Sequence, residues 1–197
     1  MRELIKMVVV LTVLTAVSGG LLAGVRAATK DRIELQVLTL VKGPVLKDIF
    51  KDASNDFIAD RFTVTHNGEE ITLFPAVIEG KVQQVALSAS GGGFGGDLGL
   101  MVAVDIDTGK ITGAGVTTHS ETPGIGSRAK SEPDLTQRFV GLSVNETFKV
   151  KKDGGQIAAI SGATVTSRGV CAAATNAGQI YSALEGDIKS KIESLSL

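Results

Sequence analysis

The chain is 197 residues long, carries 20 basic and 21 acidic side chains, and has a formal net charge of -1 at pH 7. That length suits one ordinary domain with an appendage, and the balanced charge argues against a nucleic-acid partner. One cysteine, Cys171, and two histidines, His66 and His119, are too few for an internal disulfide, an iron–sulfur cluster or a structural zinc site. We therefore expect no metal site, and any redox chemistry would need a cofactor held in another way.

The first feature along the chain is a stretch without charged side chains at residues 7–25, flanked by basic residues. The hydrocarbon core of a bilayer needs about 20 such residues, so the stretch predicts a transmembrane helix after a short flank at 1–6. A cleaved secretory signal is the alternative, although its apolar stretch usually runs only about 7–15 residues. Gly20 and Gly24 form a G-x-x-x-G pair, which favours packing against partner subunits. The basic residues on both sides do not decide the orientation.

Secondary structure after the anchor follows from periodicity and turn signals. Helical spacing predicts a juxtamembrane helix that ends near Gly43-Pro44, then a second short helix over about 45–54. Asn67-Gly68 between alternating β-formers predicts a hairpin. The remaining expected elements are a strand at 82–89, a loop at 90–96, strands at 100–105 and 111–117 joined by a hairpin turn at 107–110, an irregular segment at 118–133, a helix at 169–184 and a polar tail helix to 197.

Consecutive hairpins with helices at the ends predict an α+β fold: a single N-terminal transmembrane helix, then a mainly antiparallel sheet with flanking helices. We expect four segments. They are an N-terminal flank at 1–6, the transmembrane helix at 7–25, a juxtamembrane helix with the first hairpin at 26–75, and a cofactor-binding domain at 76–197.

A cluster of hydroxyl side chains lies at 161–167, after a short apolar piece and before the predicted helix. A helix N-terminus offers unpaired N–H donors and a partial positive charge, so this position predicts a phosphate site. A glycine there lets the backbone approach a ligand closely, and a small alanine leaves room. The alternative is an ordinary helix cap that binds nothing. The candidate residues are Ser161, Gly162, Ala163, Thr164, Thr166 and Ser167.

A second candidate is the tightly shaped loop HSETPGIGSR at 119–128. Proline and glycine define its turns, and polar groups flank an apolar isoleucine, as a planar ring with polar edges would require. A plain solvated turn is the alternative. The candidates are His119, Glu121, Thr122, Gly124, Ile125 and Gly126. A third, glycine-rich element at 91–96 lacks both the P-loop lysine and a dinucleotide-binding context, and it reads as a flexible loop or a close approach to the same ligand.

Together these elements resemble the FMN-binding domain found in the G subunit of the Rnf electron-transport complex, a domain shared with the C subunit of the Na⁺-pumping NADH:quinone oxidoreductase. The stretches that carry the resemblance are GGGFGGDLGLMVAVDIDTGKITG at 91–113, HSETPGIGS at 119–127 and SGATVTSRGV at 161–170. With the anchor, the resemblance covers essentially the whole chain and is weakest between about 27 and 75.

The resemblance implies a covalent FMN, joined by a phosphoester to the hydroxyl of Thr164, with the bond made from FAD by a separate flavin transferase. It further implies an electron-transfer component of a translocase, without catalysis of its own, inside an ion-translocating ferredoxin:NAD⁺ oxidoreductase with other Rnf membrane subunits. The flavin domain would then face the periplasmic or extracytoplasmic side of the cytoplasmic membrane. One departure is that Ala158 stands where the transferase motif usually has an acidic residue, three places before the serine of SGAT; Asp153 is the nearest acid upstream.

Two other functions are compatible with the same residues. One is a stand-alone extracytoplasmic flavin electron carrier, which co-purification with other membrane subunits would exclude. The other is a non-catalytic membrane-tethered assembly subunit, in which SGATVTS is only a helix cap and no flavin is bound. The coupling ion, the immediate electron donor and acceptor, and the flavin potential depend on neighbouring subunits.

Overall fold

The computed structural model describes residues 1–66 and 68–194, apart from the side chain of Asp31. The chain divides into two compact units, Met1–Leu40 and Val41–Leu197. The first unit contains helix α1 (Arg2–Gln36). Its segment Arg2–Lys30 includes an 18-residue window with a mean hydropathy of 2.3 and is long and apolar enough to cross a membrane. Inside it, the hydroxyls of Thr12 and Thr15 donate to carbonyls one turn earlier, which satisfies them without water. The predicted apolar helix is therefore confirmed.

The expected end of the juxtamembrane helix near Gly43-Pro44 is wrong. A π-helical segment, η1 (Val37–Lys42), is followed by helix α2 (Gly43–Ile49), so the Gly-Pro pair begins a helix. Proline suits the first turn of a helix because its missing N–H would have no partner there. The second predicted helix, over about 45–54, is thus present but shorter at its C-terminal end.

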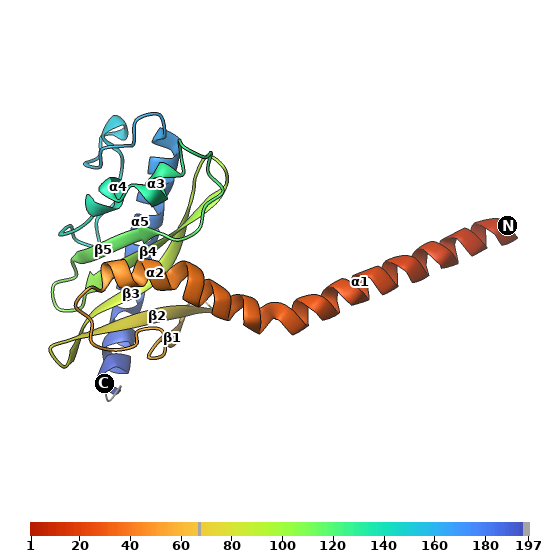
Figure 1. Ribbon diagram of the computed structural model, residues 1–197, viewed down its shortest axis with the longest axis horizontal. Coiled ribbons are helices and arrows are strands. Elements are labelled where there is room, and N and C mark those ends of the chain that lie inside the picture. Colours follow the sequence, from red (N-terminus) through yellow and green to blue (C-terminus); the bar gives the residue numbers. More distant parts are fainter. Residues whose placement is uncertain (67, 195–197) are drawn as a thin grey trace. The chain divides into compact units, whose positions relative to one another are not determined.

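Five strands form one antiparallel sheet in chain order (Figure 1): β1 (Phe62–His66), β2 (Glu69–Ile78), β3 (Lys81–Gly92), β4 (Asp97–Asp105) and β5 (Ile111–Val116). The first predicted hairpin is confirmed by the pairing of β1 with β2, from Phe62 opposite Leu73 to His66 opposite Glu69. Its turn residue Asn67 lies outside the described residues. The second predicted hairpin joins β4 to β5, so the antiparallel α+β fold is confirmed.

The glycine-rich stretch at 90–96 is only partly a loop, which corrects the sequence expectation. Strand β3 continues through Gly92, and Ser90, Gly91 and Gly92 pair with the start of β4. Glycine has low strand propensity, but Gly91 lies where β3 touches a helix, and a Cβ there would collide with the carbonyl oxygen of Gly169. The close approach of the two backbones therefore explains why position 91 is a glycine although it lies within a strand.

The remaining helices are α3 (Arg128–Ser131), α4 (Asp134–Gln137), the 3₁₀ turn η2 (Lys151–Asp153) and α5 (Thr164–Ser194). Helix α3 lies within the segment 118–133, which was expected to be irregular. The C-terminal helix was expected to start at Gly169 and to give way to a separate tail helix. Instead α5 is continuous and begins at Thr164, so the hydroxyl cluster forms its first turn.

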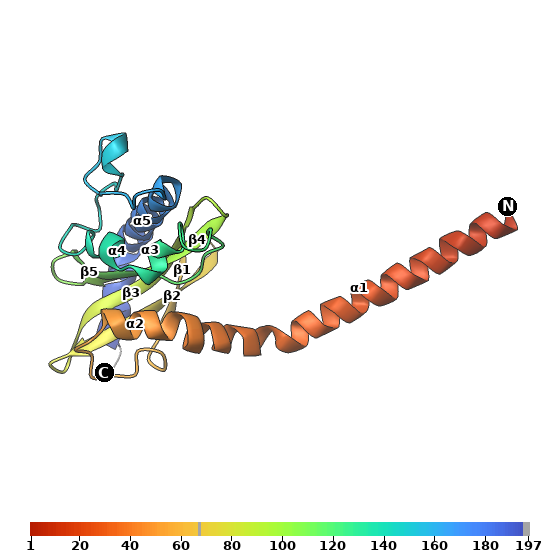
Figure 2. The same cartoon turned by 45° about the horizontal axis from the view of Figure 1, so that its top comes forward.

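Both faces of the sheet are covered (Figures 1 and 2): α5 crosses one face, and α2 lies against the other. Alternate strand residues such as Leu87 and Val102 join the core cluster that includes Ala173 and Ala177 of α5. The intervening strand residues face α2 and are buried there, among them Phe74, Ala86, Met101 and Ala103. Together with buried Leu46, Phe50 and Phe57 they form a second group. Burial on both faces explains the continuous apolar runs of the central strands.

Candidate cofactor site

Three distant stretches of the chain meet around one cavity of about 360 Å³. This volume lies at the small end of the ~300–1,000 Å³ range of small-molecule pockets. The cavity lies at the N-terminus of α5, between the turn after β3 and the loop at 119–128. Its lining residues are Phe94, Glu121, Thr122, Ile125, Gly126, Gly162, Ala163, Thr164, Val165 and Thr166.

Glu121 is the residue that ties these stretches together. Its side chain is buried, with 6% of the residue exposed. Oε1 accepts hydrogen bonds from the backbone N–H groups of Phe94 (2.8 Å) and Gly95 (3.2 Å), and Oε2 accepts one from Oγ1 of Thr166 (2.6 Å). A single carboxylate therefore joins the glycine-rich turn, its own loop and the first turn of α5.

The ionised form of Glu121 is favoured despite its burial. Burial by itself would raise the pKa of this carboxyl, but the hydrogen bonds from Thr166, Gly95 and Phe94 oppose it. Together they hold the pKa of Glu121 below the ordinary glutamate value. The site thus contains a buried negative charge.

The glycines of the two loops make room for this carboxylate. A Cβ on Gly93 would collide with Oε1 of Glu121, and a Cβ on Gly126 would lie 2.5 Å from Oε2 and 2.8 Å from its Cβ. The glycine-rich element therefore makes a close approach within the protein, and its approach to a ligand stays a prediction. The close approach is to Glu121 and, at Gly95, to the backbone carbonyl of Ser120.

The hydroxyl groups at the start of α5 differ in their hydrogen-bond partners. Thr166 donates its hydroxyl hydrogen to Glu121, while buried Ser167 donates to the carbonyl of Ala163 (2.9 Å) and accepts from the N–H of Ile160 (3.0 Å). Both residues were predicted to belong to a phosphate site, but here their hydroxyl hydrogens are committed within the protein. Thr164 is half-buried, lines the cavity, and makes no side-chain hydrogen bond within the described part of the chain.

Most of the predicted site residues line the cavity, and four do not. The carbonyl of Ser161 accepts a hydrogen bond from Nη1 of Arg128 (3.3 Å), and Nδ1 of His119 accepts one from the N–H of Glu121 (3.3 Å). Gly124 forms the turn with φ +72°, and Ser167 lies beneath the helix start as described above. Whether these residues take part in binding stays a prediction.

Phe94 and Val165 line the cavity but were not among the predicted site residues. Phe94 is 71% exposed, and with Ile125 (50%) and Val165 (43%) it forms an apolar rim. Exposed large apolar side chains around a pocket are typical of a binding surface. The signals in the sequence were a lone aromatic residue among glycines and a valine inside the hydroxyl cluster.

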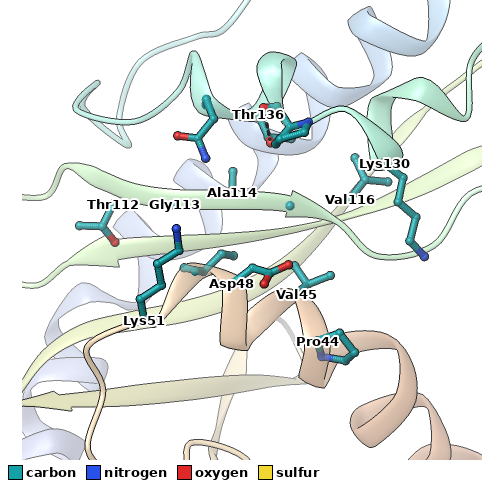
Figure 3. Close-up of a pocket in the computed structure, with 14 residues that line it drawn as sticks. Pro44, Val45, Asp48, Lys51, Thr112, Gly113, Ala114, Val116, Lys130 and Thr136 are labelled. Atoms are coloured by element: carbon teal, nitrogen blue, oxygen red, sulfur yellow. Dashed lines mark hydrogen bonds between the residues drawn. The ribbon is translucent and has the colours of Figure 1, made fainter.

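A second cavity of about 410 Å³ lies between α2, β5 and the segment of α3 and α4 (Figure 3). Asp48 of α2 and Lys51, which follows the end of that helix, line it together with Thr112 and Gly113 of β5. No predicted site residue lines this cavity. Among the described residues, no group of three or more histidine, cysteine or acidic side chains could hold a metal ion.

The chain is similar in sequence to known proteins. Residues 93–179 match the family described as the FMN-binding domain. The G subunit of an ion-translocating oxidoreductase complex from Methanosarcina acetivorans is 32% identical over 187 residues, covering 94% of this chain and 98% of that protein. The protein of the same name from Erwinia tasmaniensis is 33% identical over 195 residues, covering 92% and 91%, respectively.

Among solved structures, the chain resembles the C subunit of the Na⁺-translocating NADH-quinone reductase from Parabacteroides distasonis. The TM-score is 0.54 at 26% identity, over 64% of this chain and 77% of that one. The structure of NqrC from Shewanella oneidensis gives a TM-score of 0.53 at 23% identity, over 71% of this chain and 73% of that one, and it supports the fold alone.

Proposed function

The chain belongs to the family of G subunits of ion-translocating oxidoreductase complexes, and from this premise we propose that it carries a covalent FMN at Thr164. It is a single-pass membrane flavoprotein of a multisubunit complex and acts as an electron relay. In our proposal the phosphate of FMN is esterified to the hydroxyl of Thr164, and the electrons pass through this bound flavin to other subunits.

The observation that carries the proposal is the position of the Thr164 hydroxyl. It is half-buried at the first residue of a long helix, lines the cavity, and is not engaged by another described side chain or carbonyl. The first backbone N–H groups of a helix have no intrahelical partner and carry a partial positive charge. A phosphoester at Thr164 would be stabilised by those groups.

The other lining residues fit the rest of an FMN. The apolar rim of Phe94, Ile125 and Val165 suits the face of an isoalloxazine ring, while Gly162 and Ala163 leave space beside the phosphate. The flavin supplies the electron chemistry, and the protein supplies position and local charge. Thr122 and Glu121 bring polar atoms to the same cavity.

The partners and orientation belong to the same proposal. We infer that a separate flavin transferase forms the phosphoester from FAD, with AMP as the leaving group. We also infer that the flavin unit faces the extracytoplasmic side of the cytoplasmic membrane. Ala158 replaces the acid that transferase motifs usually carry, and Asp153 does not supply it from nearby, because Asp153 pairs bidentately with Arg168 (2.7 and 2.8 Å). We expect attachment to proceed from the remaining SGAT motif.

Peptide mass spectrometry of protein purified from its native host tests the proposal. The peptide containing Thr164 should carry the added mass of one FMN minus water. The Thr164→Ala variant should fold and remain anchored but be colourless, because no hydroxyl is left to esterify. The matched control is Thr147→Ala, at an exposed threonine outside the cavity, which should keep the flavin. Full retention of covalent flavin in Thr164→Ala would overturn the proposal.

The bonds of Ser167 favour one second function. Its hydroxyl stabilises the turn before α5 through Ile160 and Ala163, as a purely structural helix cap would. A membrane-tethered assembly subunit would need no more than this. Native protein without flavin, from cells that contain the transferase, would establish that function.

A further inference from the structure

Glu121 places a fixed negative charge at the wall of the cavity that holds Thr164. Both oxygens of the carboxylate accept hydrogen bonds, from two backbone N–H groups and one hydroxyl. An ionised carboxylate is an acceptor only, so this set of three donors matches the charged form. These hydrogen bonds therefore stabilise the ionised carboxylate and also fix its position.

That charge is stabilised by dipoles and not by a close ion pair. Within the described residues, no lysine or arginine nitrogen lies within 4.0 Å of the Glu121 carboxylate. Charges in partly buried sites interact more strongly than in water because the effective dielectric constant is lower. A group bound in the cavity would therefore experience the field of Glu121.

We propose that Glu121 lowers the redox potential of the flavin bound at this site, which rests on the proposed function. Reduction of a flavin by two electrons takes up one proton at neutral pH, so the bound group gains one negative charge. Its repulsion by the Glu121 carboxylate makes the reduced form less stable, and the flavin becomes a stronger reductant. In the test below, dithionite supplies the two electrons.

Thr166 affects the redox potential of the flavin through Glu121, so it is a positioning residue. Its effect on the potential is opposite in sign to that of the Glu121 charge. Its hydroxyl dipole partly compensates the charge on Oε2 through the 2.6 Å hydrogen bond. Removing this hydroxyl while keeping the carboxylate leaves the negative charge less compensated. The potential should then stay unchanged or fall further, whereas removing the charge itself should raise it.

Reductive titration with dithionite and mediators, on the detergent-purified full chain, measures the midpoint potential of each variant. Glu121→Gln keeps the side-chain shape and an acceptor for the Phe94 and Gly95 amides, and its potential should shift to a more positive value. Thr166→Val should give no shift or a negative one. The control is Glu185→Gln, which removes a paired surface carboxylate roughly 30 Å along α5 at about 1.5 Å per residue, and it should leave the potential unchanged.

The opposite signs separate an electrostatic role from a structural one. If Glu121 only holds the loops together, both variants loosen the same contact and their potentials shift in the same direction, which would overturn the inference. An unchanged or more negative potential in Glu121→Gln would also overturn it. Should that variant fail to bind flavin, a positive shift in Thr166→Val would still contradict the inference. Peptide mass on the wild type separates the two levels, because a Thr164 peptide without FMN would refute the proposed function and with it this inference.

Discussion

Glu121 and the glycines around it depend on one another. The buried carboxylate needs three donors from two distant stretches, and these can only reach it where the loops carry no Cβ. Gly93 and Gly126 therefore serve the scaffold of the site before they serve any ligand. Backbone conformation is not the reason for glycine at position 126, because the φ of Gly126 is not in the left-handed region.

At this scale we predict that Gly126→Ala destabilises the protein and separates Glu121 from Thr166. The added Cβ would lie 2.8 Å from both Cβ of Glu121 and Oγ1 of Thr166. Overpacking of this kind typically costs about 1–3 kcal/mol in the free energy of unfolding. Chemical denaturation followed by circular dichroism measures the loss. Gly92→Ala, where a Cβ meets no atom within 4 Å, is the control and should be near neutral.

At the scale of elements, the position of α5 follows from its contact with the end of β3. A Cβ on Gly169 would lie 2.7 Å from the carbonyl oxygen of Gly92 and 2.9 Å from Cδ2 of Leu98. The first two turns of α5 therefore lie directly against the sheet, which presents the helix N-terminus to the loops at 93–96 and 119–128.

Two glycines of the same helix should respond to alanine with opposite signs. Alanine is the better helix former by about 1 kcal/mol, so Gly186→Ala, which meets no atom within 4 Å, should stabilise the protein by up to that amount. Gly169→Ala gains the same propensity but collides with β3, and we expect a net loss of up to about 2 kcal/mol. Denaturation midpoints of the two variants compare them directly; stabilisation by Gly169→Ala would contradict the close packing.

At the scale of the whole molecule, the two units are built for different surroundings. The apolar side chains of α1 are exposed along its length, for example Leu14 at 60% and Leu22 at 72%, as expected for a helix covered by lipid. The second unit has a core on both faces of its sheet and contains every residue of the candidate cavity.

From this division we predict that residues 41–197, expressed without the first unit, fold as a water-soluble domain. They contain the whole sheet, α2 and α5, so the buried contacts of the core are retained. Circular dichroism should show a cooperative thermal transition without detergent. Aggregation or a non-cooperative transition would mean that the second unit needs the anchor to fold.

Elements governed by local periodicity were predicted well from the sequence. The apolar helix, both hairpins and the antiparallel order follow from hydropathy, alternation and turn residues, which act over a few neighbouring positions. The start of α5 was misplaced by five residues because threonine, serine and valine are weak helix formers. Packing of Ser167 under the turn, with bonds to Ile160 and Ala163, overrides that propensity.

The order of residues along the chain is enough to predict an apolar span, an antiparallel α+β domain and a hydroxyl-rich segment that contains Thr164. Folding in three dimensions settles which groups are free and which are committed. It joins Glu121 to Thr166 across 45 positions and leaves Thr164 at the wall of the cavity. The packing of α5 on the sheet determines these hydrogen-bond partners, and no local pattern in the chain predicts them.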